Sequence, residues 1–596
     1  MASKHGRSMR FLDDGARRRE LLLVFAGASV LLYALVLRID PAVVPPQWDE
    51  FIFLTNARRL FEGQRPFVDY VWFLPPAGEA LYATWFHLTG GASAGSARLL
   101  AHFLVVTTAL CWYFTLRSLG QNPRWAASGA LALPLLYFPV WGIPLHHWTA
   151  CFFLSVAALL LVRGLLQGPG PRSRWLLAMA GCAWALCALA VQTHGVVGAA
   201  LLLGLWWHLR SQDHPGARYP PLRGQALSVA AGASLPIAVL GIYLVSVGAV
   251  GTFVQAAVLY VFGNYHQKGG VNDLGFLSDL PLRMTRLWTT AAPLWIRAPQ
   301  VLADALTPIA TLLLCLLAVA IGGKTALQEK ARQRSVHLWF VPVLALTTVV
   351  MWSRPDVMHL AFYGTTLAVV CWVSLWQSAR RGERLARWGA LLWLGMLGTG
   401  AVSHHLLTLV QGASPVPVFH RMRQVDPALE GLPWVDARMI ASSPLLMQLR
   451  RTHLQFPQFR LFAVPEGAVP YFLSMPPAVP DTLLLPATAR YDGPVEYERT
   501  RQALLQRPAD VLVLVPWEQG RLFLEPPAWA DDRAKALADF LVENYVPLAQ
   551  IGQARVYVLK GAQVAPSSPT LRSATATVGD RERPEDAGLR PDASPP

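Results

Sequence analysis

Long apolar runs separated by short polar loops dominate the first two thirds of the chain. An α-helix needs about 20 apolar residues to cross the hydrocarbon of a bilayer. The pattern predicts about eleven spans, and the chain is therefore expected to be an α-helical polytopic membrane protein. The runs lie at residues 21–37, 98–116, 125–141, 147–162, 175–192, 195–209, 225–248, 301–321, 336–352, 357–377 and 388–410.

The distribution of positive charge predicts how these helices are oriented. With the basic N-terminus, residues 1–20, in the cytoplasm, the cytoplasmic segments carry 22 Lys and Arg residues, whereas the short loops on the other side carry only Arg354. Lys and Arg are enriched in cytoplasmic loops. The first run, 21–37, has no small-residue cleavage site and is predicted to be an uncleaved anchor. Two long loops, 38–97 and 249–300, are then expected outside the cytoplasm.

The composition agrees with a membrane protein, because 54% of the residues are hydrophobic and only 15% are charged. The net charge of +15 lies in short clusters between apolar runs rather than in a basic domain with interleaved aromatic residues. This pattern argues against a nucleic-acid partner. All six cysteines lie within apolar segments without CxxC spacing, which favours a packing role over disulfides or metal ligands.

After residue 410 the pattern changes to short apolar runs and amphipathic segments. It predicts a small extracytoplasmic α/β domain over residues 411–562. Residues 563–596 are too poor in large apolar side chains to fold and are predicted to be a disordered tail. The elements expected in the domain are apolar runs at 460–464 and 483–485, helices at 495–506 and 531–545, and strands at 509–515 and 554–559.

The loop after the first predicted span contains several acidic residues. Asp49 and Glu50 lie directly at the membrane exit, and Asp69 follows. Carboxylates at a boundary between water and lipid are costly, which suggests a functional role. The segment after Glu50 predicts an amphipathic helix that ends at Gly63. Its apolar face is formed by Phe53, Leu54, Ala57, Leu60 and Phe61, and its polar face by Asn56, Arg58, Arg59 and Glu62. A second amphipathic helix is expected at 77–88, after Pro75 and Pro76.

This loop resembles the integral-membrane GT-C glycosyltransferases, which include the protein O-mannosyltransferases and the lipid A aminoarabinose transferases. The resemblance depends on Trp48-Asp49-Glu50, the run 57–63, Pro66 with Asp69, Pro75-Pro76 and Arg98. A body of many spans followed by an exported α/β domain fits the same family. The resemblance implies a GT-C-like fold for residues 21–410, a bacterial inner membrane location and a donor sugar linked to polyprenyl phosphate.

The resemblance also implies an active-site acid in the first outer loop, at Asp49 or Glu50. Transfer of a sugar to a hydroxyl needs a base for the acceptor proton. We expect Asp49 to be this base, with Glu50 and Asp69 as further catalytic candidates. A structural alternative exists for each: Asp49 could cap the following helix, Glu50 could complement its dipole, and Asp69 could be a turn residue.

The phosphate that leaves requires cations or hydrogen-bond donors. Arg354 lies in a predicted outer hairpin with Asp356 and His359, where a planar guanidinium could bind phosphate. A local Arg354–Asp356 ion pair that closes the turn is the alternative. His266 and Lys268 in the second outer loop are weaker candidates. So are Arg58 and Arg59, which could instead contact lipid headgroups. Leu74 stands where many family members have a His or Lys before the two prolines.

Three histidines, His146, His147 and His194, are also expected on the outer side. Their spacing matches no established metal-ligand motif, and polar residues at an interface explain them more simply. No metal site and no cofactor are predicted, and a requirement for a divalent metal remains open.

The leading hypothesis is an inverting glycosyltransferase, of hexosyl or pentosyl type, that acts on the extracytoplasmic face. It would move a sugar from a polyprenyl-phosphate-linked donor to a hydroxyl of a lipid, glycan or protein acceptor. A flippase or transporter of lipid-linked sugars is the main alternative, although the predicted spans have few charged residues at their centres. An O-antigen polymerase or ligase would use the same kind of lipid-linked substrate.

Overall fold

The structure is a computed structural model, and the chain divides into two compact units, Met1–Ser442 and Ser443–Pro596. The residues it describes are 48–131, 133–134, 138, 142–211, 222–264, 362, 372, 384, 387–389, 391–392, 395, 426–455, 460–464, 468–473, 495–515, 532–551 and 554–561.

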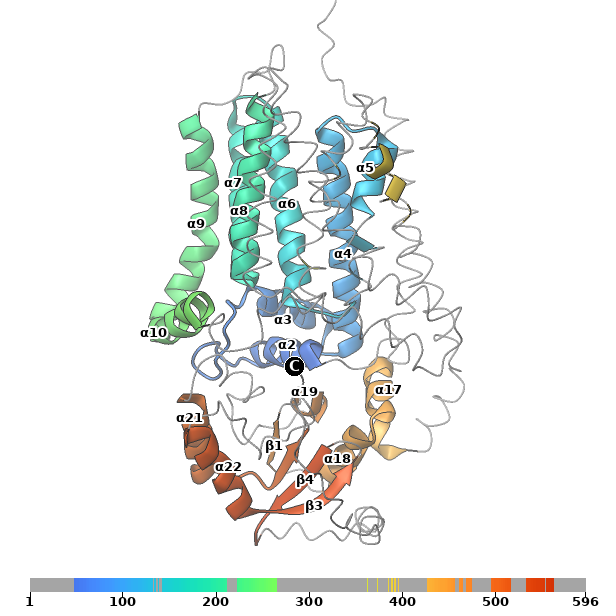
Figure 1. The fold of residues 1–596 in the computed structure, drawn as a ribbon, viewed down its shortest axis with the longest axis vertical. Helices are drawn as coiled ribbons and strands as arrows, with labels where there is room; N and C mark the ends of the chain where they lie inside the picture. The colour runs from blue at the N-terminus through green and yellow to red at the C-terminus, as the bar shows by residue number, and fades with distance from the viewer. Residues whose placement is uncertain are drawn as a thin grey trace, which may run out of the picture. The chain divides into compact units, whose positions relative to one another are not determined.

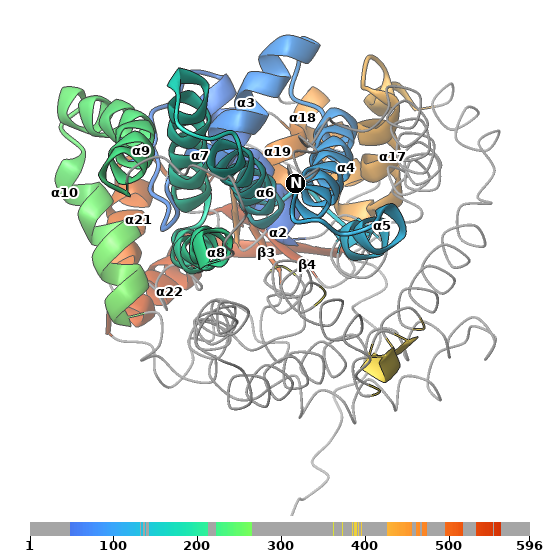
Figure 2. The same ribbon diagram turned by 90° about the horizontal axis from the view of Figure 1, so that it is seen from above.

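The first unit contains a bundle of five long helices (Figures 1 and 2). The first two run in the same direction, and from the second onward successive helices point in opposite directions. In chain order they are α4 (Ala94–Ser118), α6 (His146–Leu166), α7 (Pro171–Ala190), α8 (Gln192–Ser211) and α9 (Leu222–Ser246). Within the described residues, four of these, α4, α6, α7 and α9, are long and apolar enough to cross a membrane.

Two shorter helices, α2 (Trp48–Phe61) and α3 (Ala77–Thr89), lie across one end of this bundle (Figure 1). Helix α2 packs on α3, and α3 contacts α4, α6 and α7. Gly63, with φ +86°, follows the end of α2, and Gly90, with φ +78°, forms the C-cap of α3. Both glycines adopt the left-handed conformation that ends a helix without a Cβ penalty. The loops that precede α6 and α8 and follow α9 lie at this same end.

Helices α7 and α9 pack with their backbones in close contact. A Cβ atom added to Gly181 of α7 would overlap the carbonyl oxygen of Val229, and one added to Gly232 of α9 would overlap that of Ala178. Small residues permit such close approach, and membrane helices commonly use them at their interfaces. On its other side α9 exposes large apolar residues, among them Leu235, Ile242 and Val245.

Helices α4, α6, α7 and α9 match the predicted spans 98–116, 147–162, 175–192 and 225–248. Helix α8 covers the predicted span 195–209 but is not among these four candidates. The predicted span 125–141 differs, because helix α5 covers only Pro123–Ala130 and much of the remaining range lies outside the described residues. The spans predicted at 21–37, 301–321 and 336–352 lie entirely outside them, as do most residues of 357–377 and 388–410. The first unit also contains α10 (Val250–Phe253), the π-helix η4 (Val254–Asn264), the 3-10 turn η6 (Pro427–Leu429) and α17 (Trp434–Ser442).

The second unit is built around a four-stranded mixed sheet. The strands are β1 (Leu461–Val464), β2 (Val511–Leu514), β3 (Tyr545–Ile551) and β4 (Ala554–Leu559), in the order β1-β2-β4-β3. The β1–β2 pair is parallel and the other two pairs are antiparallel. The helices are α18 (Pro444–Gln455), α19 (Ala468–Leu473), α21 (Val495–Gln506) and α22 (Asp532–Asn544). Leu504 of α21 and Leu537 and Leu541 of α22 pack against Leu512 and Leu514 of β2.

Most of these elements were predicted from the sequence. Helix α21 and strand β4 have the predicted limits, and β2 and α22 fall within the predicted ranges. Helices α18 and α19 and strand β3 were not predicted. Strand β3 lies at the edge of the sheet, and its pairing with β4 is irregular between Pro547 and Ala549. The run at 483–485 and the predicted tail 563–596 lie outside the described residues.

Candidate active site

The two acidic residues at the start of α2 have different environments. Asp49 is exposed, whereas Glu50 has 0% exposure. Both lie in the first turn of the helix, where the dipole favours negative charge. The Glu50 side chain turns inward to the bundle, and Asp49 next to it faces solvent. Of the two carboxylates, only that of Asp49 is accessible to a substrate.

Glu50 forms an ion pair with Arg98 of α4. Arg98 Nε donates to Glu50 Oε1 at 2.7 Å, and Arg98 Nη2 donates to Oε2 at 2.6 Å. The Arg98 side chain also has 0% exposure, so both charges are removed from water. Two parallel charge-assisted hydrogen bonds fix the orientation of both groups. The pair therefore attaches the first turn of α2 to the first turns of α4.

Asp436 of α17 binds the start of the same helix α4. Its Oδ1 accepts from the Ala94 backbone N–H at 2.9 Å, and Ser93 Oγ, as the N-cap, accepts from the Ser96 N–H at 3.0 Å. Burial raises the pKa of Asp436 to about 7, although the amides and nearby arginines oppose this shift. Two side chains thus satisfy backbone donors that a helix N-terminus leaves open. Together with Glu50, they hold the start of α4 in place.

Arg58 and Arg59, near the end of α2, are not equivalent. Arg58 Nε forms an ion pair with Glu62 Oε1 at 2.7 Å, and its side chain is 20% exposed. Arg59 is buried, with its guanidinium carbon 5.4 Å from the centre of the Tyr70 ring. Asn56 is also buried. The side of α2 that was predicted to be its polar, exposed face is therefore partly buried.

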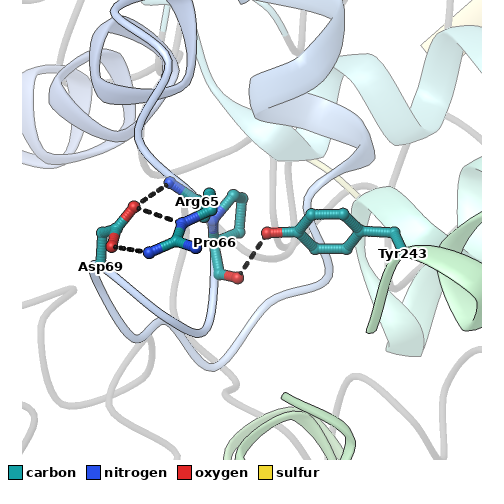
Figure 3. A network of polar contacts seen from close by, with 4 residues as sticks. All are labelled: Arg65, Pro66, Asp69 and Tyr243. Atoms are coloured by element: carbon teal, nitrogen blue, oxygen red, sulfur yellow. Dashed lines mark hydrogen bonds and ion pairs between the residues drawn. The ribbon is translucent and has the colours of Figure 1, made fainter. Parts of the chain in front are cut away.

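Asp69 belongs to a closed turn with Arg65 (Figure 3). Asp69 Oδ2 accepts from the Arg65 backbone N–H at 2.7 Å and from its Nε at 3.1 Å, and Oδ1 accepts from Nη2 at 3.0 Å. These hydrogen bonds hold the pKa of Asp69 below its ordinary value. Asp69 is consequently a turn residue that keeps its charge, with its side chain 33% exposed.

The segment 62–76 is attached to the bundle at two points. The Tyr243 hydroxyl of α9 donates to the Pro66 carbonyl at 2.8 Å (Figure 3). Gln192 Nε2, at the start of α8, donates to the carbonyls of Phe73 at 2.9 Å and Ala257 at 2.8 Å. Between these points Phe67 is buried with φ +64°, a conformation that is uncommon for a bulky residue. The segment is thus held in one conformation next to α2 and α3.

The three histidines lie together at the same end of the bundle. His147 Nδ1 is 3.1 Å from His194 Nε2, and the rings of His146 and His147 have centroids 4.4 Å apart. His147 and His194 are buried. In the part of the chain that the structure describes, no group of three His, Cys, Asp or Glu residues could hold a metal ion.

Five predicted phosphate-binding residues lie outside the described residues: His266, Lys268, Arg354, Asp356 and His359. Sequence reasoning noted Arg98 but not its partner, and it missed Asp436 and Glu79 entirely. Glu79 is a carboxyl group buried in the first turn of α3. A glutamate that follows Pro-Pro in an amphipathic segment gives no sign in the sequence of whether it will be buried or exposed.

No protein-family model and no curated protein match the chain. Among solved structures, it is similar to the crystal structure of ArnT from Cupriavidus metallidurans bound to undecaprenyl phosphate. That similarity has 16% identity and a TM-score of 0.48, over 90% of this chain and 97% of ArnT.

An oligosaccharyltransferase from Archaeoglobus fulgidus, in complex with Zn and sulfate, is similar with 12% identity and a TM-score of 0.42, over 87% of this chain and 71% of that one. The arabinofuranosyltransferase AftD from Mycobacteria has 13% identity and a TM-score of 0.40, over 91% of this chain and 40% of AftD.

Proposed function

We propose that the protein is a membrane glycosyltransferase that moves a sugar from a polyprenyl-phosphate-linked donor to an acceptor hydroxyl on the extracytoplasmic face. The observation that best supports this function is the pair of neighbouring carboxylates at the end of the apolar bundle. Asp49 is exposed there, while Glu50 is fixed by Arg98 behind it. An exposed acid on a rigid support at the end of membrane-crossing helices suits catalysis on a lipid-linked substrate.

Asp49 is the general base in this proposal. As the acceptor oxygen attacks the anomeric carbon, its proton passes to the Asp49 carboxylate. The bond between the anomeric carbon and the phosphate oxygen breaks, and the electron pair leaves with polyprenyl phosphate. Attack from the face opposite the phosphate inverts the configuration at the anomeric carbon. A positioned general base contributes about 10²–10⁴-fold to the rate of such a step.

Glu50 has a positioning role. Its carboxylate is committed to Arg98 and has no exposure, so it orients the first turn of α2 and hence Asp49. Asp69 keeps the 62–76 segment in its closed turn through Arg65. Neither residue needs to exchange a proton during the reaction.

The phosphate that leaves is stabilised by cations of the outer loops. Arg58 is the accessible arginine of α2, because Arg59 is buried against Tyr70. His266 and Lys268 of the second loop remain candidates from the sequence alone. So do Arg354, with Asp356 and His359, in the predicted outer hairpin. Charge-assisted hydrogen bonds from such groups favour the developing phosphate dianion over the singly charged diester of the donor.

The test uses purified protein in liposomes with radiolabelled polyprenyl phosphate sugars, and it measures label transferred to membrane or added acceptors. Wild type should transfer, whereas Asp49→Asn should lose about 10²–10⁴-fold in rate and Arg354→Ala should also lose transfer. Glu430→Gln, a change at an exposed carboxylate outside the site, is the matched control.

Two results would overturn the proposal. Wild-type protein that moves the lipid-linked sugar across the liposome membrane without transferring it would be a flippase. Wild-type transfer with full activity in Asp49→Asn would place the base elsewhere.

A further inference from the structure

Glu79 is a buried carboxyl group in the first turn of α3, and it is 2% exposed. Among the described residues, neither Oε1 nor Oε2 has a hydrogen-bond partner. Burial raises the pKa of Glu79 to about 8, although its own backbone amide opposes the shift, so the group is largely protonated at neutral pH. Unlike Glu50, it forms no ion pair with an arginine in the part of the chain that the structure describes. Buried polar groups are nearly always hydrogen-bonded, and each exception calls for an explanation.

A purely structural explanation for Glu79 is weak. An acid in the first turn can complement the helix dipole, but the deep burial of Glu79 makes its charged form unfavourable. An unsatisfied buried polar group costs about 1–3 kcal/mol, which an apolar residue at this position would avoid. Stability alone therefore favours a different residue here. A group retained at such a cost commonly has a function.

The surroundings of Glu79 indicate what it could bind. Tyr82, one turn further along α3, is fully buried, and its hydroxyl also has no hydrogen-bond partner within the described ranges. Residues three apart lie on the same side of a helix. The Phe53 ring packs against Tyr82 at a centroid distance of 5.0 Å. Tyr70 lies close enough to Glu79 that the carboxylate contributes to raising the pKa of Tyr70. The Glu79–Tyr82 pair thus combines two unused polar groups with aromatic rings.

This combination fits a sugar better than the other parts of the proposed donor. A phosphate is an anion that favours cationic partners, and neither Glu79 nor Tyr82 supplies a positive charge. A prenyl chain would leave both polar groups unsatisfied. Sugar hydroxyls both donate and accept hydrogen bonds, and a carboxyl group and a phenol can do the same. The C–H faces of a sugar ring pack against aromatic side chains, which supply apolar area.

We propose that Glu79 and Tyr82 bind the glycosyl group of the lipid-linked donor through its hydroxyls. This inference rests on the proposed function and specifies which part of the site holds the sugar. Both side chains are buried, so binding includes displacement of groups packed around them. Phe53 of α2 packs on Tyr82, and Tyr70 of the 62–76 segment lies near Glu79.

The experiment compares Glu79→Leu, Glu79→Gln and Tyr82→Phe with wild type in liposomes. Two ligands are used: the polyprenyl phosphate sugar that wild type accepts, and polyprenyl phosphate without a sugar, measured as a competitive inhibitor. Glu79→Leu should raise KM for the sugar donor at least about tenfold, while the inhibition constant of the bare phosphate stays within about twofold. Glu79→Gln, which keeps hydrogen-bonding groups, should have an intermediate KM. Thr84→Val, on the exposed side of α3, is the control.

Thermal unfolding separates a ligand-binding role from a structural one. Glu79→Leu should unfold at the same temperature as wild type or higher, because it removes an unsatisfied buried acid. A lower unfolding temperature together with equal weakening of both ligands would show that Glu79 is structural. An unchanged KM in Glu79→Leu would overturn the inference while leaving the proposed function intact. Absence of transfer in wild type would instead reject the proposed function.

Discussion

Arg98 and Glu50 form a two-point ion pair with no exposure to water, across 48 positions of the chain. Removing one member of such a buried pair leaves a charge without compensation and costs about 3–5 kcal/mol. We expect Arg98→Met and Glu50→Leu, made singly, to lower the thermal unfolding temperature in detergent markedly.

The double variant Glu50→Leu/Arg98→Met tests whether the charges themselves are needed for folding. Because it removes both charges, the double variant should be more stable than either single variant and close to wild type. Apolar replacement of a buried ion pair is often neutral. Its transfer activity should remain low if the pair positions Asp49. A double variant that unfolds as early as the singles would contradict this explanation.

Tyr243→Phe tests the attachment of the 62–76 segment to α9. The change removes one hydrogen bond, to the Pro66 carbonyl, and keeps the aromatic ring. The expected loss of stability is about 0.5–1.5 kcal/mol, confined to this segment. Amide hydrogen exchange in the 62–76 segment should become faster, with no change in α7, which serves as the internal control. Equal acceleration in both regions would indicate global rather than local loosening.

The contact between α7 and α9 should not tolerate a larger residue. Gly181→Ala and Gly232→Ala each place a methyl group against a backbone carbonyl, which cannot move aside as a flexible side chain can. Each is expected to destabilise the protein by about 1–3 kcal/mol, as overpacking typically does. Gly241→Ala, in the same helix α9 but with nothing near its Cβ position, should be neutral or slightly stabilising. Thermal unfolding of the three variants in one detergent gives the comparison.

The raised pKa of Glu79 predicts a dependence of stability on pH. The ordinary pKa of 4.5 applies to the unfolded chain, and the folded protein has a value of about 8, so the folded state holds the proton more tightly. The contribution of this proton to the free energy of unfolding is complete below about pH 4.5 and is lost as the pH rises through about 8. Between these values the free energy of unfolding falls by on the order of 1 kcal/mol per pH unit. Glu79→Gln should remove this pH dependence, because an amide does not titrate.

The measurement is the difference in unfolding temperature between Glu79→Gln and wild type, from about pH 5 to about pH 9. The unfolding temperature of Glu79→Gln should rise relative to that of wild type as the pH increases. A constant difference would show that Glu79 does not titrate in this range.

The orientation of the helices can be tested by labelling introduced cysteines. Glu62 and Gln167 are both exposed. Glu62 follows α2 and Gln167 is the C-cap of α6, and Figure 1 shows α2 and the end of α6 at opposite ends of the described helix bundle. Because the distribution of basic residues predicts that the end near Gln167 is cytoplasmic, Glu62→Cys should react with an impermeant maleimide in intact cells. Gln167→Cys should react only after permeabilisation. The reverse pattern would place Asp49 in the cytoplasm and reject an extracytoplasmic reaction.

Local pattern was sufficient to predict much of the secondary structure. The helix after Glu50, its end at Gly63 and the limits of α21 and β4 all follow from periodicity and helix-stop signals. Strand β3 was missed because Pro547 argues against a strand in the middle of a sheet. The structure accommodates this proline at an edge, beside an irregular register.

The partners of the candidate site residues could not be read from the sequence. Glu50 and Asp49 are adjacent and chemically similar, and only the position of Arg98, one helix away, makes one of them buried. Asn56 and Arg59 were placed on a polar face, yet the 62–76 segment covers them through Tyr70. Pairings of this kind depend on tertiary packing, which overrides helical periodicity.

Gln192 links two segments that are far apart in the chain through one side-chain amide. Its Nε2 has two hydrogens, and each is donated to a different carbonyl, that of Phe73 and that of Ala257. The same amide thus joins the 62–76 segment to the π-helix η4 through two hydrogen bonds. A displacement of Phe73 that breaks its hydrogen bond would free the Gln192 side chain to turn away from η4 as well.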